Sequence, residues 1–504
     1  MLSAHSTPSR AGSREWIGLA VLTLPCLVYA MDLTVLNLAV PQLTQQLKPS
    51  AAELLWMLDI YGFLVAGALV TMGTLGDRIG RRRLLMIGAA AFGLASLAAA
   101  FATSATQLIV ARAVLGLAGA TLAPSTLSLI RNMFHDETER RSAIAVWIAS
   151  FSAGTALGPV LGGLLLEHYW WGSVFLINVP VMALLLVLGL WLLPEYRDPA
   201  AGRLDLASTV LSLSAVLAVI YGVKQVASTG FSPEALAASL LGFALGVVFL
   251  RRQRQLVHPF VDLALFRRPA FRAALLVNLS GAFFIAGIHL FVAQFLQLVL
   301  GLSPLTAALW LLPSALAFIL GSGVVPALAH RWSPRRLMTA GLLLAALGFV
   351  VLLFVGAGGS LWVVVIALTV FSFGFTPVAS LTTDLVVTSA PAERAGAAAA
   401  LSETAFEFGG ALGIALLGSL GAVLYRARVL AALPEGLDTE AAAAAVGTLG
   451  GAVAVAAAVP RLADALLATA RQAFIDGMLA SAALGVLCLL LLAWHVSRVL
   501  REPD

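Results

Sequence analysis

The chain alternates long apolar runs with short polar or charged joints, and each run has the length that a helix needs to cross a bilayer. About 20 residues rising 1.5 Å each span the hydrocarbon layer. The pattern predicts about 14 membrane-spanning helices. We place them at 16–39, 53–74, 84–104, 107–130, 142–166, 172–193, 205–226, 234–250, 272–299, 304–328, 336–357, 361–386, 398–424 and 473–496.

The composition supports an all-α membrane protein. Of the 504 residues, 61% are hydrophobic and 11% are charged, and the mean hydropathy is +0.99. Soluble proteins are about a quarter charged, so most of this surface must face lipid. The net charge of +5 is typical of basic cytoplasmic loops and does not indicate nucleic-acid binding.

A short charged turn, Leu75–Arg83, joins the second and third predicted helices. Basic residues in short loops stay in the cytoplasm, so Arg81–Arg83 indicate the side of this joint. The turn returns in weaker form at residues 330–338, where Arg331, Arg335 and Arg336 repeat three of its arginines at one offset. A membrane protein built from two related halves is typical of transporters.

The basic residues also predict the topology. All but seven of the 30 lysines and arginines fall on the side of the first basic turn. The exceptions are Arg112, within a span, and Lys48, Lys224, Arg426, Arg428, Arg461 and Arg471, on the predicted outer side. Both termini are therefore expected in the cytoplasm.

The spacing of the two basic turns predicts two six-helix bundles separated by two extra helices. The expected segments are a cytoplasmic N-terminus (1–15), a first bundle (16–193), a linker with helices 7 and 8 (194–271), a second bundle (272–496) and a cytoplasmic tail (497–504). Residues 425–472, between helices 13 and 14, are expected to form an external loop with a hairpin of helix or strand.

Ionisable residues inside the apolar runs are the strongest functional candidates, because charge in hydrocarbon is costly. They are Asp32, Asp59, Arg112, Glu403 and Glu407. The two glutamates are four residues apart and share a helix face. A carboxylate that attracts both a proton and a lipophilic cation makes the two compete, and that competition can couple their movements.

Other interpretations of these residues stay open. Asp59 could instead be a charge at a helix end. The two glutamates could form a polar entrance to their helix, and Arg112 could be a structural partner of an acid in the first half. The aromatic residues Trp56, Tyr61, Trp310 and Phe406 are candidates for stacking on a cation, or else serve packing and interface anchoring.

Two further motifs favour a moving transporter. Asp77 and Arg78 are predicted to form a conformational latch at the end of helix 2, where charge pairs can hold one arrangement of the halves. In helix 5, Gly154, Gly158 and Gly162 repeat every four residues with Pro159 between them. This spacing predicts a close helix seam with a bend.

These motifs resemble the major facilitator superfamily and, more narrowly, its fourteen-span drug:proton antiporters. The resemblance rests on Gly76–Arg82, on Asp32–Asn37, on Arg112 with Gly116, and on Gly154–Gly163, in the expected helices and order. It implies the major facilitator fold, and it associates the helix 5 motif with antiport.

The resemblance also implies a function. It suggests export of lipophilic cations (quaternary ammonium antiseptics, dyes and biguanides) from a bacterial inner membrane by a monomer. The driving force would be the proton gradient, with no cofactor. Asp32, Asp59, Glu403 and Glu407 match acids of the family, whereas Ser402 and Phe318 stand where one member has two more. This departure puts the transport of dications in doubt.

Two alternatives remain at this level. A major facilitator exporter of neutral or anionic molecules would need a more basic centre than Arg112 alone provides. A membrane enzyme or receptor would need a catalytic cluster or a large soluble domain, and the sequence predicts neither. No P-loop is present, and Cys26 and Cys488 lack metal-ligand spacing, so neither ATP nor a metal is expected.

Overall fold

The fold is known from a computed structural model. It describes residues 11–197, 205–256, 259, 263, 265–329, 331–356, 360–388, 395–434 and 436–500. The first residues of the expected N-terminal segment, part of the linker and the end of the expected tail lie outside these residues.

The described residues form helices and no strands, and fourteen helices are long and apolar enough to cross a membrane. The predicted fold class is confirmed. The first half contains α1 (Ser13–Leu47), α2 (Ala51–Ile79), α3 (Arg81–Ala100), α4 (Ala105–Met133), α5 (Glu137–His168), α6 (Ser173–Leu176) and α7 (Asn178–Leu192). Two further helices follow, α8 (Leu206–Thr229) and α9 (Pro233–Gln255).

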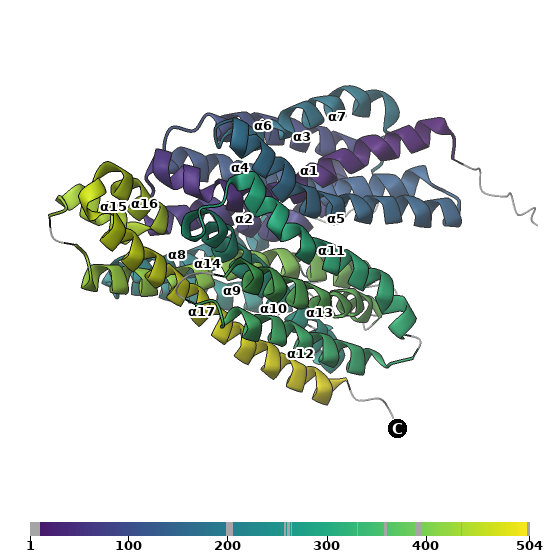
Figure 1. Ribbon diagram of the computed structural model, residues 1–504. Helices are drawn as coiled ribbons and strands as arrows, with labels where there is room; N and C mark the ends of the chain where they lie inside the picture. Colours follow the sequence, from purple (N-terminus) through teal and green to yellow (C-terminus); the bar gives the residue numbers. More distant parts are fainter. Residues whose placement is uncertain are drawn as a thin grey trace, which may run out of the picture.

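The second half begins with the short η1 (Leu265–Arg267) and continues through α10 to α17. These elements are α10 (Pro269–Gln294), η2 (Phe295–Val299), α11 (Pro304–Ala329), α12 (Pro334–Leu352), α13 (Leu361–Thr388), α14 (Ala395–Ala431), α15 (Thr439–Gly447), α16 (Leu449–Ala458) and α17 (Pro460–Val499). Figure 1 shows the two halves as separate layers of helices.

Several helices extend beyond the apolar runs that predict them. α17 begins at Pro460, well before the expected start at residue 473, and runs for 40 residues. Its first turns carry Arg461, Asp464 and Arg471. These charges interrupt the apolar run, and the helix continues through them. Proline at the first helical position is equally compatible with a helix start.

Local chemistry explains several of the helix starts. Ser50 caps α2 by accepting a hydrogen bond from the Glu53 amide at 3.2 Å, and the Glu53 carboxylate accepts one from the Ser50 amide at 3.0 Å. Between α2 and α3, Gly80 has a φ of +110°, a conformation that residues with a Cβ rarely adopt. The basic turn is thereby tightened to one residue.

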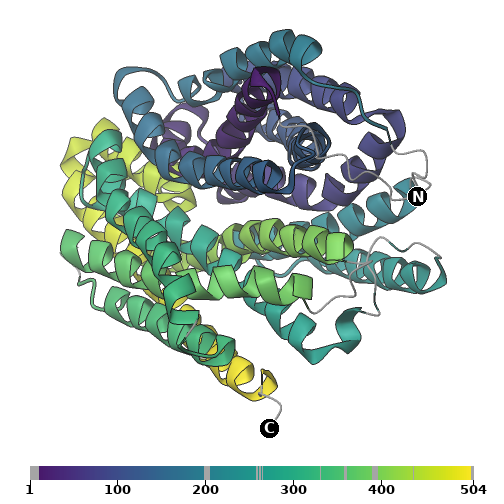
Figure 2. The same cartoon turned by 90° about the vertical axis from the view of Figure 1, so that its right-hand side faces the viewer.

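We call the end of the molecule that carries this turn the basic end, and the opposite end the far end. α1 starts and α17 finishes at the basic end, as an even number of crossings requires (Figure 1). Helices of the two halves diverge toward the basic end (Figures 1 and 2).

At the far end the two halves are joined by hydrogen bonds. The Glu167 carboxylate of α5 accepts bonds from the Ser303 hydroxyl at 2.9 Å and the Leu305 amide at 3.2 Å. Gln297 of η2 donates to the Leu38 carbonyl of α1 at 3.0 Å. The structure is therefore a state closed at the far end.

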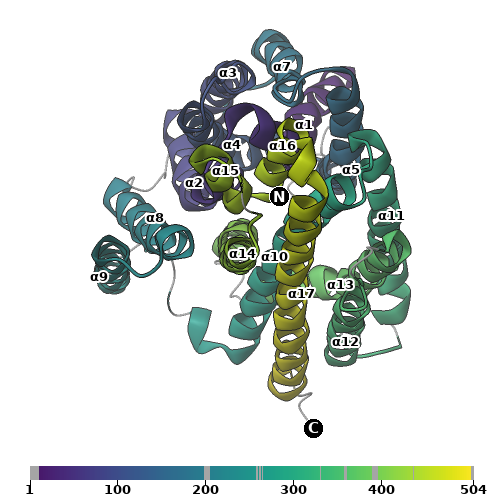
Figure 3. The ribbon, with the colours of Figure 1, turned by 60° about the vertical axis from the view of Figure 1, so that its left-hand side comes forward.

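The two extra helices pack against each other beside both halves, and α8 contacts α2 and α14 (Figure 3). Its contact surface includes a small apolar cluster in which Ile220 meets Phe63, Ala411 and Ala415. α8 therefore touches the helices on which three of the candidate acids lie.

The segment between α14 and α17 forms the helices α15 and α16 at the far end (Figures 1 and 3). The Tyr425 hydroxyl donates to the Ala445 carbonyl at 2.9 Å, which ties α15 to the end of α14. α16 also packs on α1, so this segment contacts both halves.

The glycines of α5 lie against α1. A Cβ on Gly154 would meet that of Ala30 at 2.9 Å, and one on Gly158 would meet the Met31 Cα at 3.2 Å. Gly162 faces Val35 in the same row. The four-residue spacing therefore brings the backbones of α1 and α5 close together, and Pro159 lies inside α5 without ending it.

We expect Gly154→Ala to destabilise the first half, because the added methyl overlaps α1 and forces the helices apart. Overpacking of this kind costs about 1–3 kcal/mol. The measurement is thermal unfolding of the purified protein in detergent.

The matched control is Gly246→Ala in α9, where a Cβ would meet its nearest neighbour, the Ala215 Cβ, at 4.0 Å. An equal loss of stability in both variants would contradict the close seam.

Candidate functional site

The first buried ion pair joins α1 and α4. Arg112 and Asp32 pair through Nη1 and Oδ2, and both side chains are buried. The Arg112 Nε also donates to the Met57 carbonyl of α2 at 3.1 Å. Asn178 of α7 donates to Asp32 at 3.4 Å and to Ser96 at 3.1 Å. Arg112 thus has an acid partner in the first half.

The second buried ion pair joins α2 and α8. The Lys224 Nζ lies 2.8 Å from Oδ1 and 2.7 Å from Oδ2 of Asp59, and the exposed fractions of the two side chains are 1% and 0%. The same nitrogen lies 3.6 Å from the centre of the Trp56 ring. The carboxylate and the aromatic face therefore enclose one cation.

This arrangement corrects the topology analysis, in which Lys224 was assigned to the outer side. Lys224 is instead one of the most deeply buried residues of α8. The sequence does contain the relevant signal, because Lys224 falls inside the predicted span 205–226. A lysine in a span needs a buried partner, and Asp59 was available.

Glu407 connects the two halves. The Tyr29 hydroxyl of α1 donates to its Oε1 at 2.8 Å, and Tyr29 is buried. Glu403 lies one turn nearer the basic end of α14 and is exposed. The two glutamates are therefore near each other along α14, but only Glu407 contacts the other half through a hydrogen bond in the described part of the chain.

The four candidate aromatic residues separate into two groups. Trp56 and Tyr61 lie at the buried pairs, and the Arg112 Cζ is 4.6 Å from the centre of the Tyr61 ring. Trp310 packs on Trp362, 5.0 Å away between ring centres. Phe406 is 38% exposed. Only Trp56 and Tyr61 are placed to meet a cation beside the buried acids.

The predicted latch residues are not paired with each other. Asp77 pairs with Arg81, whose Nη2 lies 2.5 Å from Oδ1, while Arg78 is exposed and forms no ion pair with the described residues. Arg81 also donates to the Pro124 carbonyl of α4 at 3.4 Å. In this state the partner of Asp77 is therefore Arg81, the first residue of α3, and the latch role of Asp77 and Arg78 stays a prediction.

Ser402 of α14 stands where one family member has a third acid, and here it forms hydrogen bonds within the second half. Asn278 of α10 donates to both the hydroxyl and the carbonyl of Ser402 at 2.9 Å. This position links two helices of the second half and supplies no charge. Among the described residues, no cluster of His, Cys, Asp and Glu could hold a metal ion.

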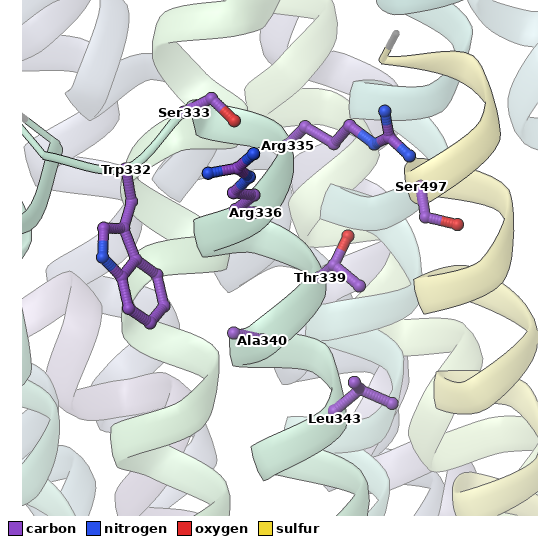
Figure 4. A pocket seen from close by; sticks show the side chains of 8 residues that line it. All are labelled: Trp332, Ser333, Arg335, Arg336, Thr339, Ala340, Leu343 and Ser497. Atoms are coloured by element: carbon purple, nitrogen blue, oxygen red, sulfur yellow. The ribbon is translucent and has the colours of Figure 1, made fainter.

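A separate pocket opens at the basic end, between the start of α12 and the end of α17 (Figure 4). Arg335 and Arg336 of the second basic turn line it, with Ser497 on α17 opposite. It contains none of the candidate site residues, so it is distinct from the buried acids.

The comparisons with known proteins agree with this architecture. A sequence profile of the Major Facilitator Superfamily matches residues 23–414. The chain belongs to this superfamily. It is a secondary transporter and not an enzyme, as its sequence predicts.

The chain is 44% identical to the multidrug efflux pump LfrA of Mycolicibacterium smegmatis over 99% of both proteins. It is 38% identical to the methyl viologen resistance protein SmvA of Salmonella typhimurium, over 92% of this chain and 93% of that protein.

Solved structures show the same fold. An inward-facing bacterial homologue of the lysosomal transporter Spinster superimposes with a TM-score of 0.67 at 18% identity. That match covers 98% of this chain and 100% of the other.

We expect Arg112→Gln to destabilise the protein by about 3–5 kcal/mol, because it leaves the buried Asp32 carboxylate without a counterion. The double variant Arg112→Gln with Asp32→Asn should recover much of this loss. Chemical unfolding in detergent measures both.

The control is Arg428→Gln, which removes the exposed partner of Asp476. Exposed pairs contribute about 0–1 kcal/mol. Equal losses for Arg112→Gln and Arg428→Gln would show that burial does not govern the Arg112 pair.

Proposed function

We propose that this protein is a proton-coupled antiporter that exports lipophilic cations, such as quaternary ammonium antiseptics, dyes and biguanides, across a bacterial inner membrane. The names of its relatives support drug efflux, since LfrA is a multidrug efflux pump and SmvA confers methyl viologen resistance. The energy source is the proton gradient, and no cofactor takes part.

The observation that carries the proposal is the buried Asp59 carboxylate beside the face of Trp56. An aromatic face and a carboxylate are the two groups that attract an organic ammonium in an apolar surrounding. The pair lies where α2 meets α8 and α14, at the junction of the two halves. A site at this junction can change its access when the halves rock.

The balance of charge supports a cationic substrate. The four acids Asp32, Asp59, Glu403 and Glu407 stand against two buried bases, Arg112 and Lys224. Although Lys224 makes the centre more basic than Arg112 alone, each base is already neutralised by an aspartate. The remaining charge comes from the two glutamates, which disfavours the alternative substrate class of anions.

The transport cycle follows from the closed far end. In this state, cations reach the carboxyls from the basic end, which we assign to the cytoplasm along with both termini. When the halves rock open at the far end, protons enter and displace the bound cation outward. The monomer contains every group that this cycle requires.

We expect Asp59→Asn to abolish cation efflux driven by an imposed pH gradient, because the amide neither holds a proton nor attracts a cation. The measurement is ethidium transport by purified protein in liposomes. Transport should fall to the level of liposomes without protein.

The matched control is Asp464→Asn, which removes an exposed acid at the start of α17. It should transport as the unmodified protein does. Undiminished ethidium transport by Asp59→Asn would remove Asp59 from the mechanism.

Glu407 should affect the range of substrates more than folding. Glu407→Gln keeps an acceptor for the Tyr29 hydroxyl but removes the charge, so dications should lose more transport than monocations. Comparing methyl viologen with ethidium in the same liposomes measures this. The control is Tyr29→Phe, which removes the hydrogen bond but keeps the charge of Glu407, so the ratio of methyl viologen to ethidium transport should not change. Equal losses of transport for both cations in Glu407→Gln would show that Glu407 has a structural role.

A further inference from the structure

The chain contains two lysines, Lys48 and Lys224, and every other basic residue among its 30 lysines and arginines is an arginine. Lys48 is exposed at the end of α1, at a φ of 44°. Lys224 is buried. Arginine keeps its charge in proteins, whereas a buried lysine can release its proton. Lys224, which is buried against Asp59, is therefore a basic residue that is able to become neutral.

The surroundings of the Lys224 ammonium match those of a bound organic cation. Its nitrogen lies 2.7 Å from the Asp59 carboxylate and 3.6 Å from the centre of the Trp56 ring. An ammonium over an aromatic face beside a carboxylate is the arrangement that a substrate cation would adopt. The side chain thus fills the position that the proposed substrate needs.

We propose that Lys224 is a tethered competitor of the substrate, and that it releases a proton when a substrate cation takes its place between Asp59 and Trp56. The proposal rests on the proposed export of cations, and it assigns the release of the coupling proton to α8, one of the two extra helices.

The exchange balances in atoms and charge. In the resting site the Lys224 ammonium neutralises Asp59. When a monovalent cation enters, an N–H bond of Lys224 breaks, the electron pair stays on the nitrogen, and the proton passes to water. The neutral amine then leaves the carboxylate to the substrate. When the substrate departs, a proton from the far end restores the ammonium.

The position of Lys224 suits proton entry from that end. It stands five residues before the end of α8 at Thr229, about 8 Å away at 1.5 Å per residue. Asp59 stands eight residues after the far-end start of α2 at Ala51, about 12 Å away, and twenty residues before its other end at Ile79. The pair is therefore nearer the far end than the basic end.

Other ionisable groups on the packed helices complete the surroundings. α4 supplies Arg112, which contacts the α2 backbone just before Asp59, and α14 supplies Glu403 and Glu407. α9 carries Glu234 in its first turn and arginines in its last turns. Of these, Glu407 is engaged by Tyr29 and Arg112 by Asp32, whereas Asp59 is the ion-pair partner of Lys224.

The decisive variant is Lys224→Arg. Arginine keeps the positive charge, the pairing with Asp59 and the contact with the Trp56 ring, but it does not lose its proton. If Lys224 were a structural counterion, the variant would retain function. We expect instead normal thermal stability, at least about tenfold weaker binding of tetraphenylphosphonium, and no proton release on binding.

Binding and proton release are measured together on the full chain in detergent, in weakly buffered solution with a pH indicator. The unmodified protein should release about one proton per cation bound. Binding and release by Lys224→Arg equal to those of the unmodified protein would overturn the assignment to Lys224. Absence of cation binding in the unmodified protein would instead overturn the proposed function.

A second measurement does not depend on the folding of that variant. Lys48→Arg leaves Lys224 as the one lysine of the chain, so selective ¹³C labelling of lysine gives a single Cε signal. We expect this signal to move from the charged to the neutral position when tetraphenylphosphonium is added to protein in lipid nanodiscs. A signal that remains at the charged position with the site saturated would contradict the proposal.

Discussion

The cost of placing charge in hydrocarbon shapes the centre of this transporter. An ionised group there needs a counterion or a change of protonation state, and each solution has consequences for neighbouring helices. Asp32 is neutralised by Arg112 and Asp59 by Lys224, so four charges are buried as two pairs. These pairs bind α1 to α4 and α2 to α8. Packing of the first half and its chemistry therefore depend on the same side chains.

The two pairs communicate through α2. Arg112 donates to the Met57 carbonyl, two residues before Asp59, while its guanidinium holds Asp32. On the other side, Glu407 reaches across the junction of the halves to Tyr29. A shift of α14 against α1 breaks that hydrogen bond, and a shift of α8 against α2 separates Lys224 from Asp59. In the proposed cycle, rocking of the halves would therefore change the surroundings of these acids.

The sequence was sufficient for the number of helices and for the repeat of the basic turn, and it located Asp32, Asp59 and Arg112 within apolar runs, whereas it assigned Lys224 to the outer side. Those features depend on hydropathy and on short motifs. The partners in the ion pairs were harder to predict, because Lys224 stands 165 positions from Asp59 and contacts it only when α8 packs on α2. The Asp77 pair was missed for a local reason, since the one-residue turn at Gly80 brings Arg81, the first residue of α3, back beside Asp77. Trp310 and Phe406 are aromatic like Trp56, and only their packing in the structure distinguishes them from it.

The closeness of Lys224 to Asp59 has an electrical consequence. With the amine charged the pair is neutral, and with the amine neutral and a monovalent cation bound it is neutral again. The proposed exchange at this pair would therefore move no net charge across the bilayer. Work at this position would be drawn from the difference in pH alone, and a cell that maintained its membrane voltage but lost its pH difference could not use the site to expel a monovalent compound.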